Sequence, residues 1–197
     1  MQVIMDQTMN TFYFVRHAHA DWTPEENRSL SARGRNGANR VADALQQYPI
    51  SAIYSSPFLR AFETITPLAK RLGYAVHPDS ELRERQLGNS TPVDFFEAVE
   101  ATWQNPSFAY PVGESNAAAQ QRGLAVLRRL HEQYVKEHLV LSTHGNLMAL
   151  ILQHFDPSVD FLFWRSLTMP DIYTVNLDLA GEAVLSRLWQ ESWCDEL

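Results

Sequence analysis

Hydrophobic and polar residues alternate along this chain with two different periods. Short apolar runs at residues 11–15, 52–55, 74–77 and 139–142 are typical of buried strands. Between them, apolar residues recur every three or four positions and predict amphipathic helices at 31–48, 57–72, 115–136 and 146–153. Residues 171–179 and 183–189 predict a hairpin around residues 180 and 181. Residues 89–113, rich in proline and aromatic residues, are the least regular part.

This alternation of strands and helices predicts an α/β fold. Such a pattern favours a mostly parallel sheet with helices on both faces. No repeat, low-complexity segment or long linker divides the 197 residues, so we expect a single domain, with residues 1–10 as a short N-terminal extension.

Charge and composition narrow the classes of function. The formal net charge is −7, which argues against nucleic-acid binding, because that needs a basic face to neutralise phosphates. The longest apolar run, residues 147–152, is far shorter than the roughly 20 residues that span a bilayer. The N-terminus lacks the features of a secretory signal, and Cys194 is the only cysteine, so no disulfide forms within the chain. We expect a cytoplasmic protein that binds neither nucleic acid nor membrane.

Residues suited to phosphate chemistry follow the predicted strands. Arg16 and His17 end the first strand, Arg60 follows the second, and His144 follows the fourth. Because the carboxyl ends of parallel strands meet at one edge, we expect these side chains to converge there. A neutral imidazole is a competent nucleophile near pH 7, and guanidinium groups match phosphate oxygens in shape and charge. No Walker loop is present, which disfavours nucleotide-driven transfer.

Five blocks of sequence carry a family resemblance. They are F-V-R-H-A (14–18), S-S-P-F-L-R-A (55–61), L-R-E-R-Q-L-G (82–88), G-E-S (113–115) and S-T-H-G-N (142–146). In this order and spacing they resemble the histidine phosphatase, or phosphoglycerate mutase-like, superfamily. The resemblance implies a three-layer α/β/α fold and no metal or other cofactor. It also implies His17 as the nucleophile, Arg16, Arg60 and His144 as the phosphate pocket, with His144 catalytic as well, and Glu84 as proton donor.

The chain departs from the family pattern next to the nucleophile. Ala18 stands where the family has glycine, and a Cβ would cost about 1–2 kcal/mol if that position needed a positive φ. His19 replaces the usual Glu, Ser or Thr. We expect the substrate contacts to come from a wider set of residues, namely His19, Arg28, Trp103, Phe108 and Asn146.

Within the resemblance, a phosphatase for a small phosphorylated metabolite is favoured. Residues 86–113 contain no Lys or Arg, whereas a mutase must hold a bisphosphate with extra cations. A phosphohistidine-protein phosphatase is the nearest alternative, and a phosphoglycerate mutase is a further one. Whether the chain forms a homodimer is left open.

Two other classes of protein stay in view. His17, His19 and Asp21 spell H-x-H-x-D, a spacing found in metal-dependent hydrolases, although barrel enzymes of that kind need about 250 residues. A catalytically inactive binding module with the same fold is the other alternative.

Overall fold

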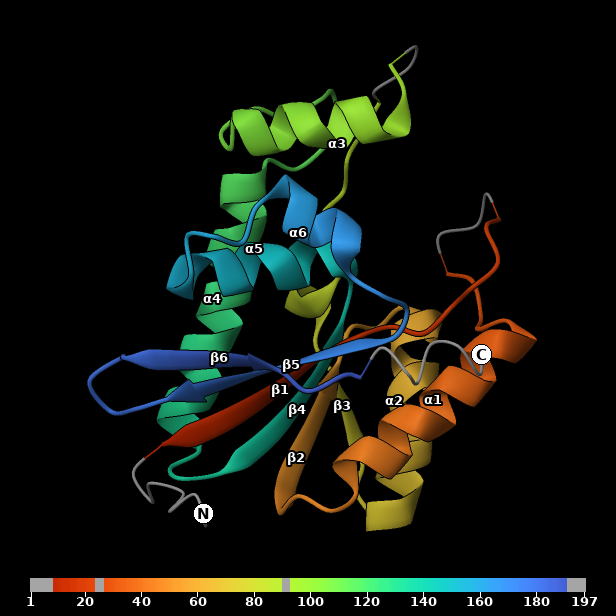
Figure 1. Cartoon of the computed structure of the whole chain (residues 1–197), viewed down its shortest axis with the longest axis vertical. Coiled ribbons are helices and arrows are strands. Elements are labelled where there is room, and N and C mark those ends of the chain that lie inside the picture. Colours follow the sequence, from red (N-terminus) through yellow and green to blue (C-terminus); the bar gives the residue numbers. More distant parts are fainter. Residues whose placement is uncertain (1–8, 24–26, 90–92, 191–197) are drawn as a thin grey trace.

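A computed structural model describes residues 9–23, 27–89 and 93–190 of the chain. Most of the expected N-terminal extension and Cys194 lie outside these described residues. The described part contains one mixed β-sheet with helices on both of its faces (Figure 1). The predicted α/β fold class is confirmed.

The sheet has the strand order β3-β2-β4-β1-β5-β6. Its strands are β1 (Asn10–Arg16), β2 (Ile50–Ser55), β3 (Val76–Pro78), β4 (His138–Thr143), β5 (Asp171–Leu177) and β6 (Ala183–Arg187). The first four run parallel, while β5 pairs antiparallel with both β1 and β6. The register of β1 on β4 pairs Arg16 with Thr143, so the residues that follow both strands emerge side by side.

Two pairs of long helices cover the sheet. Helices α1 (Ala32–Leu45) and α2 (Leu59–Leu72) pack on one face, where their apolar side chains meet Tyr13, Val15 and Ile53 of the strands. Helices α4 (Asn116–Gln133) and α5 (Gly145–Phe155) cover the other face (Figure 1). Because each central strand is covered on both sides, it reads as a continuous apolar run.

The helix ends follow local capping chemistry. The Ser31 and Ser115 hydroxyls accept the backbone N–H of Gly34 and Ala118 and so begin α1 and α4. Gly73 ends α2 with φ of 73°, a left-handed conformation that glycine adopts without strain. The predicted α1 was three residues too long, because its last turn unwinds after Leu45 into the approach to β2.

Two short helices correct the sequence prediction. Residues 89–113 were expected to be irregular but contain α3 (Phe95–Gln104), whose N-cap Asp94 accepts two backbone N–H groups. Helix α6 (Phe161–Ser166) was not predicted, and a 3-10 turn (η1) spans Ser80–Leu82. Helix α3 lies beyond the carboxyl edge of the sheet, above α5 and α6 (Figure 1).

The segment that carries α3 is held at its base. Asn89 donates its backbone N–H to Pro111 at 3.0 Å, and Glu114 donates to Gln86 at 2.7 Å. Gly88 has φ of 82°, and a Cβ on it would lie 2.6 Å from the backbone of Gly113. Only glycine fits this crossing of two chain segments, so the sequence L-G at 87–88 fixes where the excursion begins.

Candidate active site

His17 lies at the carboxyl end of β1, in the first position beyond the strand, and is 8% exposed. Its Nδ1 lies 2.8 Å from the carbonyl oxygen of Ala18. A carbonyl only accepts hydrogen bonds, so Nδ1 carries the proton and Nε2 keeps its lone pair. Burial, with the charges of Arg60 and Arg16, lowers the pKa of His17 to about 3. The imidazole is therefore neutral at pH 7, as a nucleophile must be.

Arg60 faces this lone pair from the first turn of α2. Its Nε lies 3.3 Å from Nε2 of His17, and its guanidinium carbon lies 4.9 Å from the centre of the Phe58 ring. Thr64, one turn further, donates to the Arg60 carbonyl and accepts the backbone N–H of Ala18 at 2.9 Å. Helix α2 thus holds both the Arg60 cation and the turn that follows His17.

Arg16 approaches from the other side. Its Nη1 donates to the carbonyl of Leu167 at 2.7 Å, which fixes the side chain below the loop that follows α6. A Cβ on Gly145 would lie 2.9 Å from Nε of Arg16, so a glycine after His144 is required for this close approach. Burial lowers the pKa of Arg16, while the nearby Glu84 and Asp171 carboxylates oppose that shift.

Several nitrogens around His17 are buried without a hydrogen-bond partner among the described residues. They are Nε of Arg16, Nε of Arg28 and Nδ1 of His144. The charges of Arg16 and Arg28 both act on His17, and the ring centres of His17 and His144 are 5.2 Å apart. Buried donors without partners are rare in folded proteins. Several such groups around the His17 imidazole form an arrangement suited to binding an anion.

His144 is fully buried as the N-cap of α5, directly after β4. Its Nε2 lies 2.8 Å from the hydroxyl oxygen of Ser56, and the Phe58 ring stands against it edge to face. Burial lowers the pKa of His144 well below its ordinary value, and the neighbouring His17 and Arg60 act in the same direction. Both histidines of the site are therefore neutral at pH 7.

Glu84 lies in the loop after η1 and points at the start of α5. Its carboxylate accepts the backbone N–H groups of Asn146 at 3.1 Å and Leu147 at 3.0 Å, and also that of Arg85 at 2.8 Å. It therefore caps the helix that follows His144. The charge of Glu84 acts on Arg16, so the structure brings this carboxylate near the site.

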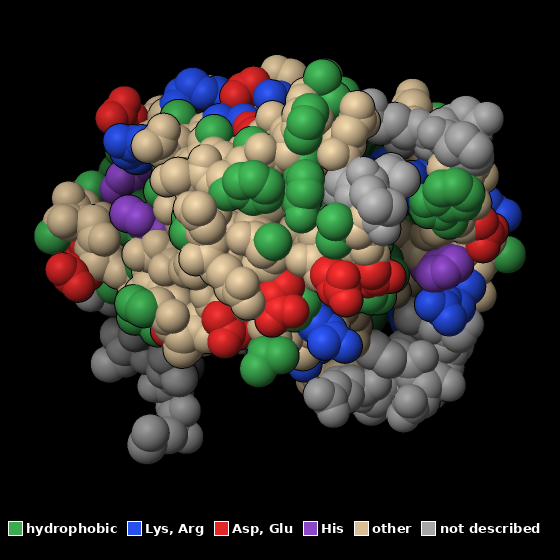
Figure 2. All heavy atoms as spheres, turned by 90° about the horizontal axis from the view of Figure 1, so that it is seen from above, with side chains coloured by type: hydrophobic (Ala, Val, Ile, Leu, Met, Phe, Trp, Pro, Cys, Tyr) green, Lys and Arg blue, Asp and Glu red, His purple; other side chains and the backbone are tan. Residues whose placement is uncertain are grey.

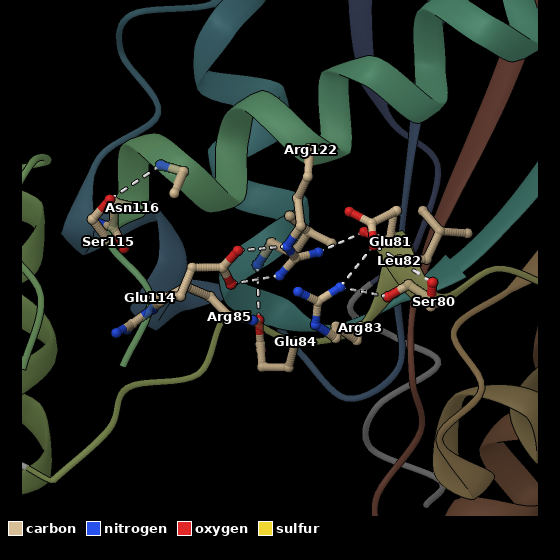
Figure 3. A network of polar contacts seen from close by, with 12 residues as sticks. Ser80, Glu81, Leu82, Arg83, Glu84, Arg85, Glu114, Ser115, Asn116 and Arg122 are labelled. Carbon is tan, nitrogen blue, oxygen red and sulfur yellow. Dashed lines mark hydrogen bonds and ion pairs between the residues drawn. The ribbon is translucent and has the colours of Figure 1, made fainter. Parts of the chain in front are cut away.

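The loop that carries Glu84 is held by an ion-pair network (Figure 3). Arg122 of α4 makes two hydrogen bonds to the Glu114 carboxylate, at 2.7 and 2.8 Å, and a third to the carbonyl of Glu81 at 2.5 Å. Glu81 also pairs with Arg83 at 3.0 Å. The network joins both stems of the α3 excursion to α4 and so limits how far Glu84 can move.

The turn at residues 18 and 19 needs no positive φ at Ala18. Ala18 is fully buried against Leu30 and Ala38 and is not among the residues with positive φ, so its Cβ causes no backbone strain. His19 is tied to the start of α1, because its Nδ1 lies 2.8 Å from the Ser31 hydroxyl and its carbonyl accepts the Ser31 N–H.

The other expected substrate contacts lie in three different settings. The charge of Arg28 acts on His17, and its Nε is buried without a partner among the described residues. Trp103 and Asn146 bind each other, with Nε1 of Trp103 donating to Oδ1 of Asn146 at 3.0 Å. Phe108 is 38% exposed and stacks edge to face on Tyr110. Hydrophobic side chains spread over the middle of the molecule seen from above (Figure 2). Phe95 and Phe96 of α3 and Val112 are exposed.

Some residues that shape the site escaped the sequence analysis. Asp171 is fully buried, accepts the N–H of Thr168 at 2.9 Å and pairs with Arg187 at 3.0 Å, so it fixes the loop that holds Arg16. Arg85 is 5% exposed, and two of its nitrogens have no partner among the described residues. The polar start of β5 was the only local signal for Asp171, and Arg85 stood in an ordinary charged run.

Two observations bear on metal binding and on membrane crossing. Within residues 9–23, 27–89 and 93–190, no three His, Cys, Asp or Glu side chains are grouped so as to hold a metal ion, so H-x-H-x-D does not form such a group. In the same part of the chain, no helix has the length and hydropathy needed to cross a membrane.

Comparison with known proteins agrees with this geometry. A model of the histidine phosphatase superfamily (branch 1) matches residues 12–192, so this chain belongs to the histidine phosphatase superfamily. The expectation of an enzyme of this class, a phosphatase, is confirmed by that match and by relatives named as phosphatases.

Individual relatives span most of the chain. The phosphoglycerate mutase-like protein 4 of Arabidopsis thaliana is 32% identical over 161 residues, which is 73% of this chain and 70% of that protein. The putative phosphoserine phosphatase 2 of Hydrogenobacter thermophilus is 26% identical over 187 residues, which is 88% of this chain and 87% of that protein. The solved structure of a mycobacterial glucosyl-3-phosphoglycerate phosphatase has a TM-score of 0.76 at 21% identity, over 91% of this chain and 98% of that one.

Proposed function

We propose that this chain hydrolyses a small phosphate monoester through a phosphohistidine formed on Nε2 of His17. The observation that carries the proposal is the ring of donors around that atom. Arg16, Arg28, Arg60 and His144 each place a cationic or neutral nitrogen near His17, and several of these nitrogens lack a protein partner. Such a ring matches the equatorial oxygens of a phosphoryl group in transfer.

In the first step, Nε2 attacks phosphorus in line with the ester oxygen. A nitrogen–phosphorus bond forms, the phosphorus–oxygen bond breaks, and Glu84 gives a proton to the leaving alkoxide. In the second step, water attacks phosphorus, a phosphorus–oxygen bond forms and the nitrogen–phosphorus bond breaks. Glu84 accepts the proton of the water, the lone pair returns to Nε2, and inorganic phosphate leaves. The arginines neutralise the charge on the phosphoryl oxygens throughout.

The neutral state of His17 supports this sequence of steps. A protonated imidazole has no lone pair on Nε2, whereas the buried ring stays neutral because its pKa is lowered to about 3. The Nδ1–H bond to Ala18 holds the ring in one orientation and leaves the lone pair on the side of Arg60. The nucleophile is thus preorganised before any substrate binds.

A small substrate with an uncharged or apolar leaving group fits the surroundings best. Residues 86–113 carry no Lys or Arg, and the face above α3 exposes aromatic side chains. The names of two relatives, one for phosphoserine and one for glucosyl-3-phosphoglycerate, support a phosphorylated metabolite as substrate.

A panel of substrates tests this proposal. Alkyl and aryl monoesters, phosphoserine, 3-phosphoglycerate, a bisphosphate and a phosphohistidine protein should be compared by kcat/KM with detection of released phosphate. The proposal expects inorganic phosphate as product, the highest kcat/KM for a small monoester, and unchanged rates after treatment with a strong chelator. Isomerised phosphoglycerate as the main product would establish a mutase instead. Loss of activity with the chelator, restored by zinc or manganese alone, would establish the metal-dependent alternative.

A further inference from the structure

The hydroxyl of Ser56 and the ring of His144 form the innermost polar contact beside the nucleophile. Both residues have no exposed surface. Oγ of Ser56 lies 2.8 Å from Nε2 of His144, and the opposite ring nitrogen, Nδ1, has no partner among the described residues. The ring thus has one nitrogen committed to the protein and one left for a ligand.

The direction of this hydrogen bond follows from the number of protons on Ser56. Its oxygen already accepts the backbone N–H of Phe58 at 3.3 Å. Its single proton has no acceptor among the described residues other than Nε2 of His144. A buried hydroxyl proton without an acceptor is costly, so the Ser56 hydroxyl donates its proton to Nε2 of His144.

The state of His144 completes the argument. Burial lowers the pKa of this ring well below its ordinary value, so it carries one proton at pH 7. If Nε2 accepts from Ser56, that one proton must sit on Nδ1. The ring centre of His144 is 5.2 Å from that of His17. An Nδ1–H group there is a donor close to the nucleophile.

We infer that Ser56 is a positioning residue that holds His144 in its Nδ1–H tautomer, so that Nδ1 donates a hydrogen bond to the phosphoryl group during transfer. The inference rests on the proposed function for the identity of the ligand. It explains why the serine that precedes Pro57 is buried against a histidine 88 residues away. Among the described residues, the Ser56 hydroxyl hydrogen-bonds to His144 and to the backbone N–H of Phe58.

The first test is made on the whole wild-type chain without substrate. With 15N-labelled histidine, long-range 15N–1H spectra at pH 7.5 distinguish the two neutral tautomers, and comparison with His144→Gln assigns the signal. The expected result is a neutral His144 with its proton on Nδ1. A proton on Nε2 would overturn the inference. Because this measurement needs no activity, it stands even if the chain releases no phosphate, a result that would count against the proposed function alone.

The second test compares two neighbouring serines. Ser56→Ala removes the donor, and we expect mixed tautomers of His144 with a 10- to 100-fold lower kcat and little change in KM. That loss is smaller than the roughly 10²–10³-fold loss on removal of a transition-state donor, because the imidazole remains. Ser55→Ala is the matched control, since its equally buried hydroxyl donates at 2.8 Å to the Ser56 carbonyl and not to His144.

The outcomes separate positioning from packing. A folded Ser56→Ala with pure Nδ1–H tautomer and normal kcat would overturn the inference, as would equal losses of kcat in both serine variants. If Ser56→Ala fails to fold, the tautomer of the wild-type chain decides the matter by itself.

Discussion

The Glu84 carboxylate accepts the backbone N–H of Asn146 at 3.1 Å, across 62 residues of sequence. The same carboxylate also accepts the N–H of Leu147, so the candidate proton donor is at the same time the cap of α5. That helix begins directly after His144. Glu84 therefore links the leaving-group side of the site to the element that holds the second histidine.

This double role makes Glu84→Gln a variant with two expected effects. The amide cannot protonate an alkoxide, so hydrolysis of an alkyl phosphate should fall about 10²-fold or more, within the range of general acid catalysis. Hydrolysis of p-nitrophenyl phosphate should fall much less, because nitrophenolate leaves without help. The amide also keeps only one acceptor oxygen for the N–H groups of Asn146 and Leu147, so the free energy of unfolding should fall by about 1 kcal/mol. Steady-state kinetics and urea unfolding measure the two effects.

Glu81→Gln is the matched control for Glu84→Gln. Glu81 lies three residues away in the same charged run and pairs with Arg83 at 3.0 Å, with both side chains half-exposed. We expect normal rates on both substrates. Equal, small losses on both substrates with Glu84→Gln would show that Glu84 is no proton donor and acts only on the helix.

The centre of the site was predictable because strand ends carry it. Arg16 ends β1, His17 and His144 follow β1 and β4, and the parallel register brings these positions together. Arg60 lies in the first turn of the helix after β2. These positions depend on local sequence and on strand order alone. Apolar periodicity predicted the strands and helices, whereas the strand order came from the structure.

The surroundings of the site depend on contacts that no local pattern reveals. Trp103 was an aromatic residue in an apparently irregular segment, yet its partner Asn146 comes 43 residues later. Ala18 seemed a defect in the family pattern, but the structure gives it an ordinary backbone and a small apolar pocket. Helix α3 was missed because nearby prolines mask its capping signal at Asp94.

Trp103→Phe tests whether this side chain acts on the protein or on the substrate. The variant leaves Oδ1 of Asn146, a residue only 4% exposed, without its donor. We expect a loss of about 1–2 kcal/mol in the free energy of unfolding and little change in KM. Phe108→Leu, at a half-exposed ring, should change stability by less than about 0.5 kcal/mol. A large rise in KM with unchanged stability would show instead that Trp103 contacts the substrate.

The stability of the protein should depend on pH through His17. Folding lowers its pKa from 6.5 to about 3, so between these values the unfolded chain binds a proton that the folded chain does not. Above pH 6.5, His17 is neutral in both states and does not change the free energy of unfolding. That free energy falls as the pH drops from 6.5 toward 3. At pH 5 the loss from His17 is about 2 kcal/mol. Urea unfolding at pH 7.5 and 5.0 should show a smaller loss in His17→Gln, and an equal loss in both proteins would contradict the assigned burial.

The most direct measurement is to identify the residue that carries phosphate during turnover. The chain should be mixed with excess substrate, quenched in alkali, where phosphohistidine survives, and digested for mass spectrometry. The account predicts one phosphate on His17, attached at Nε2, and none in His17→Ala, which should fold and lose nearly all activity. Phosphate trapped on another residue, or near-normal turnover in His17→Ala, would contradict it.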